Sequence, residues 1–294
     1  MRMSTWLRQH LAALRALLVL TVITGIVYPL AVFAVGQLPG LKDKADGSLL
    51  EVDGKVVGSS LIGQSFTDAD GVALPRYFQS RPSAAGDGYD PMSSSASNLG
   101  PEDIVDQNVF DPEGRAGLLS VICTRSKEIG AREGVDGRRA FCTEDGLGAV
   151  LSVIGPRDSD GEISRPTQVV SVNQACPAKP FLDTYRGVAV ECAQPGVDYS
   201  IGRIIPIPGD VPAVPAVPAD AVTASGSGLD PDISPEYAAI QVARVAAARG
   251  ITADQLREVV AAHTRGRTLG FLGEPRVDVL GLNVELDSRF PVRS

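Results

Sequence analysis

The stretch that decides the architecture is ALLVLTVITGIVYPLAVFAVG, residues 16–36. It contains no charged side chain, and its length matches the ~20 residues that a helix needs to cross the hydrocarbon core of a bilayer. Pro29 lies inside it. A proline is tolerated in a membrane helix because neighbouring groups re-satisfy the freed carbonyl, and a kink is expected there. The stretch predicts a single transmembrane helix near the start of the chain.

Charges on either side of this span predict its orientation. The basic residues before it are Arg2, Arg8 and Arg15, whereas Lys42, Asp43 and Lys44 follow it. Because basic residues favour the cytoplasmic side, we expect residues 1–15 in the cytoplasm and everything after Gly36 outside. A cleaved signal peptide with a cleavage site at Val32-Phe33-Ala34 is the alternative. The apolar run is longer than the apolar region of most signal peptides, so a retained anchor at residues 16–36 is favoured.

The overall composition excludes one class of partner. The chain has 294 residues, enough for one large or two modest domains, and a formal net charge of −8. Binding to nucleic acid needs a basic face that neutralises phosphates, so the acidic balance argues against such a partner.

The 4 cysteines all follow the span; they are Cys123, Cys142, Cys176 and Cys192. An even number of cysteines in an oxidising compartment indicates disulfides. Three pairings are possible, and we favour the sequential one, which closes the shortest loops. A zinc site is the alternative, but no Cys-x-x-Cys occurs, and His10 and His263 are far away in sequence.

The first part of the outside region, residues 37–139, contains signals for a hairpin, a loop and a helix. Asp53-Gly54 between apolar residues predicts a β-hairpin. Residues 77–101 are rich in Ser, Gly, Asp and Pro and predict a long loop. Apolar spacing predicts a helix over residues 118–131, with Gly134 near its end.

Residues 140–218 have a different texture and predict an inserted, β-rich subdomain. Short apolar runs separated by polar turns predict strands at residues 149–154, 168–172 and 187–192. Residues 206–218 carry a repeated proline pattern that predicts an extended, semi-rigid spacer. This subdomain would carry at least three of the cysteines.

The C-terminal part, residues 219–294, begins with two predicted helices. Ser234 is a good N-cap, Pro235 suits the first helical position, and Gly250 predicts the end of this helix. Thr252 and Gln255 form a capping-box pattern that starts the next helix. Two adjacent helices superficially suggest DNA binding, which the predicted topology and the acidic balance oppose.

Residues 277–286 predict a final strand after a turn that begins at Gly270. The fold class that follows is an α+β extracytoplasmic domain on a single N-terminal transmembrane helix, with a β-rich inserted subdomain.

The sequence contains few motifs that are typical of catalysis or nucleotide binding. The chain lacks the Asp-Lys-Thr-Gly-Thr string of P-type ATPase catalytic subunits and a P-loop, and Pro231 stands where a dinucleotide fingerprint needs its third glycine. Ser225 or Ser227 with His263 raises the alternative of a membrane-anchored extracytoplasmic hydrolase, although the G-x-S-x-G elbow is absent.

The Ser225–Gly228 run has two interpretations. It is a backbone-permissive loop that leads to a helix, or a cradle whose N–H groups bind an anion or a nucleotide. His263 lies where a histidine interacts with a helix dipole, so a structural role is favoured over catalysis.

Several strings resemble the C subunit of Kdp-type potassium-transporting P-type ATPases. The most specific are residues 224–231, 233–235 and 263–277, and the apolar span also matches. Further matches are Val57-Gly58-Ser59, Ile62-Gly63-Gln64, Phe66, Tyr77-Phe78, Arg81-Pro82-Ser83 and Ser97-Asn98-Leu99-Gly100-Pro101. Asp232 departs from the pattern, since the family usually has His there, and residues 140–218 are an insertion relative to shorter members.

The resemblance implies a non-catalytic accessory subunit of a high-affinity potassium uptake pump. Its partners would be the potassium-translocating subunit, the ATP-hydrolysing subunit, a small membrane subunit and the lipid bilayer, with no nucleic acid. The family is described as raising the ATP affinity of the catalytic subunit, a catalytic-chaperone role. No cofactor would be bound covalently, and ATP and potassium would act through the complex.

Candidate partner- or nucleotide-binding residues are Ser225, Gly226, Ser227, Gly228, Asp230, Gln241, Arg244, His263 and Arg267. ATP is cytoplasmic, whereas the charge rule places these residues outside. We therefore expect the domain to clamp the potassium-conducting subunit at its outer mouth rather than to contact ATP.

Overall fold

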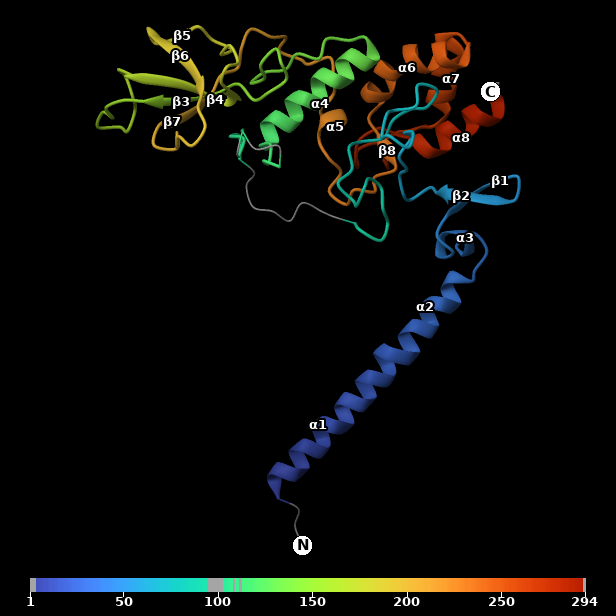
Figure 1. Cartoon of the computed structure of the whole chain (residues 1–294). Coiled ribbons are helices and arrows are strands. Elements are labelled where there is room, and N and C mark those ends of the chain that lie inside the picture. The colour runs from blue at the N-terminus through green and yellow to red at the C-terminus, as the bar shows by residue number, and fades with distance from the viewer. Residues whose placement is uncertain (1–3, 95–102, 108, 111–112, 293–294) are drawn as a thin grey trace. The chain divides into compact units, whose positions relative to one another are not determined.

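The computed structural model describes residues 4–94, 103–107, 109–110 and 113–292 (Figure 1). The chain divides into two compact units, Met1–Leu61 and Ile62–Ser294. The family-like string Ser97–Pro101 lies outside the described residues.

The first unit begins with a long apolar helix. It comprises α1 (Thr5–Val22), a π-helical turn η1 (Ile23–Val27) and α2 (Tyr28–Gly36). Among the described residues it is the one helix long and apolar enough to cross a membrane. This confirms the predicted apolar helix, although helical structure starts well before residue 16.

The π turn has a local cause in Pro29. A proline has no N–H to donate, and its ring crowds the carbonyl four residues earlier. The chain takes up this defect just before the proline, where the Tyr28 N–H bonds to the Ile23 carbonyl. Such a widened turn keeps the neighbouring helical segments continuous.

The rest of the first unit is a short helix and a hairpin. Helix α3 (Lys42–Ala45) precedes β1 (Leu49–Val52) and β2 (Lys55–Ser59), which pair antiparallel. Asp53 and Gly54 both have positive φ, 51° and 74°, as a two-residue hairpin turn of type I′ requires. The predicted hairpin is confirmed.

The second unit contains a helical part built around one apolar core. Its helices are α4 (Leu118–Glu133), α5 (Ala219–Val222), α6 (Pro235–Arg249), α7 (Ala253–Ala262) and α8 (Val279–Arg289). A small antiparallel sheet joins them, in the order β8 (Asp232–Ile233), β10 (Arg276–Asp278) and β9 (Thr264–Arg265). Phe78, Tyr237 and Leu256 are among the large side chains buried in this core.

The ends of these helices follow the sequence signals. The Ser234 hydroxyl accepts the Tyr237 N–H at the start of α6, and Gly250 ends that helix in the left-handed conformation. Thr252 and Gln255 form the complete capping box of α7. Helix α4 runs slightly beyond the predicted residue 131 to Glu133, and Gly134 is its C-cap in the left-handed conformation.

The predicted strand at residues 277–286 is wrong beyond its first two residues. Strand β10 ends at Asp278, whose carboxylate accepts the Gly281 N–H and caps α8. Val279, Leu282 and Leu286 are all fully buried. Their spacing of three and four residues marks one face of a helix, so the apolar run packs as α8.

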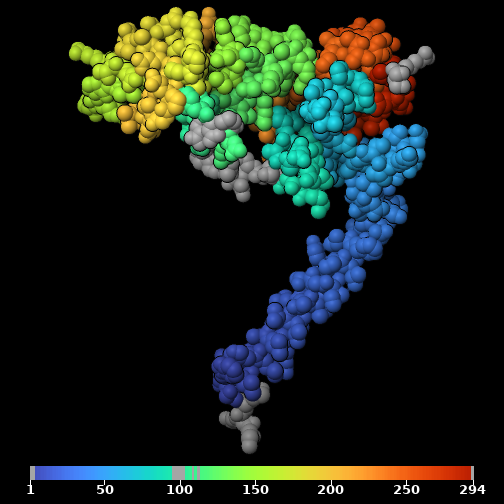
Figure 2. Space-filling model, viewed as in Figure 1, coloured from blue at the N-terminus to red at the C-terminus, as the bar shows by residue number. Residues whose placement is uncertain are grey.

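The β-rich region forms a five-stranded sheet with its own apolar cluster. Its strands are β3 (Val150–Ile154), β4 (Gln168–Ala175), β5 (Thr184–Tyr185), β6 (Val188–Ala193) and β7 (Arg203–Pro206). The order is β5-β6-β4-β3-β7, with β4 and β6 parallel and the other pairs antiparallel. The three predicted strands are confirmed. Figures 1 and 2 show this sheet at one end of the second unit, with α4 between it and α6–α8.

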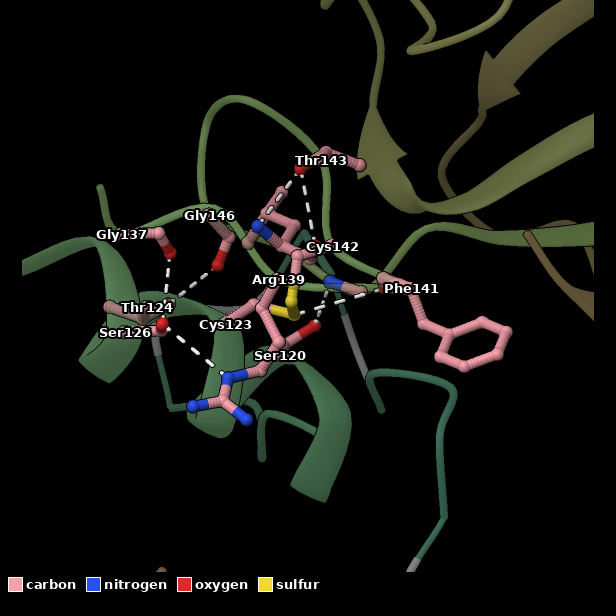
Figure 3. The surroundings of a disulfide bond; sticks show 12 residues. Ser120, Cys123, Thr124, Ser126, Gly137, Arg139, Phe141, Cys142, Thr143 and Gly146 are labelled. Carbon is pink, nitrogen blue, oxygen red and sulfur yellow. Dashed lines mark hydrogen bonds between the residues drawn. A yellow bond between two sulfur atoms is a disulfide. The ribbon is translucent and has the colours of Figure 1, made fainter. Parts of the chain in front are cut away.

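Two disulfide bonds cross-link this region, Cys123–Cys142 and Cys176–Cys192. The sequential pairing is therefore confirmed. The first bond joins α4 to the loop that enters the sheet, and Figure 3 shows hydrogen bonds beside it. There the Thr124 hydroxyl donates to the Gly146 carbonyl at 2.9 Å, and the Ser126 hydroxyl donates to the Gly137 carbonyl at 2.9 Å. The second bond joins the end of β4 to β6.

Candidate functional site

The Ser225 hydroxyl holds the Ser225–Asp230 loop by bonding to N–H groups of the same loop. Ser225 is buried, and its hydroxyl oxygen accepts the N–H groups of Gly228 at 3.0 Å and Asp230 at 3.4 Å. The Ser225 N–H donates to the Pro82 carbonyl at 3.0 Å. The N–H groups of Ser225, Gly228 and Asp230 are therefore engaged inside the protein rather than offered to an anion.

Gly228 allows this loop to lie against the Arg81–Ala85 segment. Its φ is +74°, and an added Cβ would lie 2.6 Å from the Ala85 Cβ. The Ser83 hydroxyl donates to the Gly228 carbonyl at 2.6 Å. Gly226 differs, because no heavy atom lies within 4 Å of its ideal Cβ position.

An ion pair also joins the Arg81–Ala85 segment to the Ser225–Asp230 loop. The Arg81 guanidinium lies 2.8 Å from the Asp230 carboxylate and also donates to the Thr223 carbonyl at 3.2 Å. The Tyr89 hydroxyl donates to the Arg81 carbonyl at 2.6 Å. Burial raises the pKa of Tyr89 to about 12. The structure thus brings the sequence strings around Arg81 and Asp230 together into one site.

A pocket of about 310 Å³ lies beside this site. Its lining includes Ser80, Arg81 and Tyr89, with Arg125 contributed by α4 and Tyr237 by α6. Helix α4 therefore completes a surface that begins with the N-terminal loops of the second unit.

The side-chain amides of Gln241 and Asn283 form hydrogen bonds with the backbone of Gln79 and Phe78, as a neighbouring strand would. The Gln241 side chain accepts the Gln79 N–H at 2.7 Å and donates to the Gln79 carbonyl at 3.1 Å. Asn283 accepts the Phe78 N–H at 2.9 Å and donates to the Phe78 carbonyl at 3.0 Å. Each amide satisfies both backbone groups of one buried residue, so helices α6 and α8 fix this segment from two sides.

Arg244 belongs to the same buried network. Its guanidinium lies 2.8 Å from the carboxylate of Glu133, which is fully buried at the end of α4, and it donates to the Tyr77 carbonyl at 2.9 Å. Arg132 pairs with Glu133 as well, at 2.7 Å. Gln241 is therefore buried and Arg244 partly buried, and the polar groups of both side chains are bonded to protein.

Sequence reasoning missed Gln79, Glu133 and Asn283, which complete this network. Phe78 belonged to a recognised string, and Gln79 beside it was the nearest signal. Glu133 carried no pattern of its own, and Asn283 lay within residues that were predicted as a strand. Their roles depend on partners that are distant in sequence.

His263 lies elsewhere, at the C-terminal cap of α7. Its Nε2 is 2.8 Å from the Glu285 carboxylate on α8. In the part of the chain that the structure describes, no hydrogen bond joins His263 to Ser225 or Ser227. The residues suggested for a hydrolase thus have other partners.

Arg267 lies on an exposed turn after β9, where it pairs with Glu274. Asp232 pairs with Arg276 at 2.9 Å. Burial raises the pKa of Asp232, and the neighbouring Arg276 opposes that shift. The nine candidate residues therefore fall into three groups: the Ser225–Asp230 loop, the buried Gln241–Arg244 network, and the His263 and Arg267 region.

A family model described as KdpC, the c chain of K+-transporting ATPase, matches residues 10–109 and 207–288. The unmatched stretch between them contains α4 and the five-stranded sheet.

Relatives match almost the whole chain. A protein from Kineococcus radiotolerans is 38% identical over 285 residues, which cover 97% of this chain and 96% of the relative. One from Mycobacterium tuberculosis is 38% identical over 280 residues, covering 95% and 98%. One from Streptomyces coelicolor is 38% identical over 287 residues, covering 95% and 92%. Each is named potassium-transporting ATPase KdpC subunit.

These alignments span residues 110–206, which the family model does not match, so relatives of similar length in other organisms share this region. They also confirm the resemblance that the sequence strings indicated. On the family model and on relatives that align over nearly their full lengths, this chain belongs to the KdpC family of K+-transporting ATPase subunits.

Proposed function

We propose that this chain is a non-catalytic accessory subunit of an ATP-driven potassium uptake pump. It stabilises the assembled complex and raises the ATP affinity of the ATP-hydrolysing subunit. The helix Thr5–Gly36 anchors it in the membrane with its N-terminus in the cytoplasm. The domain that follows lies outside and clamps the potassium-translocating subunit, while a small membrane subunit completes the complex.

The observation that carries this proposal is the engagement of the Ser225 hydroxyl. A catalytic serine needs its oxygen free to attack and a base that takes its proton. Ser225 instead accepts two N–H groups of its own loop, and His263 is paired with Glu285. Both features support a structural role, in which these residues keep the surface of the domain in the conformation that a partner subunit binds.

The effect on ATP affinity follows from binding rather than from contact with ATP. A subunit that binds better to the ATP-competent conformation of the complex shifts the population toward that conformation. By linkage, ATP then binds the complex with higher apparent affinity. No direct nucleotide site on this chain is required, which removes the conflict between a cytoplasmic ATP pool and an external domain.

The test compares Ser225→Ala with Ser227→Ala in purified pump complexes. Ser225 is buried and organises the loop, whereas Ser227 is exposed and its hydroxyl accepts only the N–H of Leu229 as a close backbone contact. We expect Ser225→Ala to lower the yield of complex or raise the ATP concentration needed for half-maximal turnover. Ser227→Ala should have the smaller effect. ATP hydrolysis is measured at saturating potassium over a range of ATP concentrations.

His263→Ala serves as a further variant in the same assay. Complexes that assemble with it should retain ATP hydrolysis. A serine or histidine variant that assembles normally yet abolishes all turnover would contradict the non-catalytic role, and labelling by a serine-hydrolase probe would favour a hydrolase.

A further inference from the structure

The turn between β9 and β10 presents an apolar tip to solvent. We define the tip as residues 267–274, Arg-Thr-Leu-Gly-Phe-Leu-Gly-Glu. Leu269 is 79% exposed, Phe271 68% and Leu272 50%. Single exposed apolar side chains are common on proteins, but three large ones within four residues mark a contact surface.

The backbone of the tip is held in one shape. The N–H of Thr268 donates to the Leu272 carbonyl at 2.9 Å, and the N–H of Leu272 donates to the Thr268 carbonyl at 2.9 Å. Leu269 has a φ of 55°, in the left-handed region that leucine rarely adopts. Its side chain gains little burial within the unit in return, and such strain is typical of residues kept for binding.

Charged residues that form ion pairs with one another flank the apolar residues of the tip. Arg267 pairs with Glu274, Arg276 with Asp232 at 2.9 Å, and Arg265 lies 3.8 Å from Asp278. A surface that binds lipid is rich in basic residues left free for anionic headgroups. An apolar centre with a neutral polar rim is instead the anatomy of a protein–protein interface. The charges therefore favour a protein as the occupant.

The position of the tip narrows the choice of partner. It lies within residues 207–288, which the family model matches. Elsewhere in the matched part of the second unit, the large exposed apolar residues of the described chain stand singly, at Val72, Met92 and Val214. The family is one of subunits of a pump, so a surface in its shared segment suits a partner that members of the family have in common.

We propose that the tip docks into an apolar pocket of another subunit of the same membrane complex, with Phe271 and Leu272 as the anchoring side chains. This inference rests on the accessory role proposed above. It adds the segment through which the outer domain grips its partner and the chemistry that the partner must offer there: an apolar pocket with a neutral, polar rim.

The test uses the full chain co-expressed with the other pump subunits and purified in mild detergent. Phe271→Asp should reduce recovery of this chain with the complex at least tenfold, because a carboxylate must be desolvated in an apolar pocket. Val214→Asp is the matched control, since Val214 is 82% exposed and solitary. Both variants should unfold at the wild-type temperature when purified alone, because both positions are exposed.

Leu269→Gly separates docking from folding. Glycine adopts the left-handed conformation without strain, so this variant should unfold at a temperature no lower than that of the wild type. It lacks an apolar side chain, however, and should be recovered with the complex less well than the wild type. A variant that folds as well but assembles worse has no explanation in a purely structural role.

A photo-crosslinking phenylalanine analogue at position 271 identifies the occupant. The expected product is a covalent adduct with another pump subunit, absent when the analogue stands at position 214. Adducts only with lipid, or Phe271→Asp assembling like Val214→Asp, would overturn the proposal. In the second case, a pump that still requires this chain for activity would leave the accessory role intact.

Discussion

Gly228 holds the Ser225–Asp230 loop against Ala85 because it has no side chain. Replacement by valine would place a Cβ 2.6 Å from the Ala85 Cβ at a φ of +74°. We expect Gly228→Val to lower the free energy of unfolding by about 2–4 kcal/mol through backbone strain and overpacking. Denaturant titration of the purified chain measures this. Gly226→Ala is the control and should change stability little, because open space surrounds that position; equal losses for the two variants would contradict the packing argument.

Tyr89 makes the stability of the second unit sensitive to alkaline pH. Burial raises its pKa to about 12 from an ordinary value of 10.0. The folded state therefore favours the neutral phenol, and the unfolded chain loses this proton first as pH rises. The contribution of Tyr89 to stability is complete below pH 10 and declines between pH 10 and 12. Unfolding measured across this range should show a decline that is weaker in Tyr89→Phe; an unchanged pH profile would rule out Tyr89 as its source.

Helix α8 is held to the Tyr77–Gln79 segment by the Asn283 amide. In Asn283→Asp the carboxylate still accepts the Phe78 N–H, but it faces the Phe78 carbonyl without a proton to donate. Asn283 is buried, so we expect a loss of about 2–4 kcal/mol in the free energy of unfolding. Ser288→Ala, on the exposed side of the same helix, is the control. Near-equal stability of the two variants would show that the amide pairing matters little.

One disulfide links α4 to the loop that enters the sheet, and the other links the end of β4 to β6. Peptide mapping of the unreduced protein should recover linked peptides for Cys123–Cys142 and Cys176–Cys192, and thiol labelling after denaturation should find almost no free groups. Replacing one pair by serines should cost about 3 kcal/mol, since each bond closes a loop of fewer than about 20 residues. Four reactive thiols would contradict both the pairing and the oxidising compartment.

For the whole molecule, the testable property is orientation in the membrane. Arg8 and Arg15 precede the uncharged part of the helix that ends at Gly36, so we expect the domain after it to be external. Protease added to intact cells with a permeabilised outer envelope should digest that domain, while a cytoplasmic marker protein stays intact. Protection of the domain would show that it lies in the cytoplasm, where it could contact ATP directly.

The whole molecule also combines parts that the family model matches with a stretch that it does not match. The family model matches residues on both sides of the β-rich region but not that region itself. Yet α4, which lies in the unmatched stretch, supplies Glu133 to the buried network and Arg125 to the pocket beside Arg81. Helix α4 is therefore part of the helical core, although it lies outside the residues that the family model matches. The bounds of the predicted inserted subdomain, residues 140 and 218, stay a prediction.

The sequence by itself determined the features whose causes lie within a few residues. The apolar span, the Asp53-Gly54 turn, the Ser234 and Thr252 caps and the end of α6 at Gly250 all occur as expected. Each depends on local backbone geometry or on composition, so neighbouring residues suffice to specify it. The same holds for β3, β4 and β6, whose apolar runs are bounded by turns.

Only the tertiary structure decided the features that depend on distant partners. Residues 279–289 became a helix because one helical face of that run packs into the core. Asn283 bonds to Phe78 across 205 positions, and Arg81 pairs with Asp230 across 149. Local propensity is too weak to outweigh burial of apolar area or satisfaction of buried polar groups. The shape of the Ser225–Asp230 loop was therefore set by packing against the Arg81–Ala85 segment, beyond the reach of any sequence window.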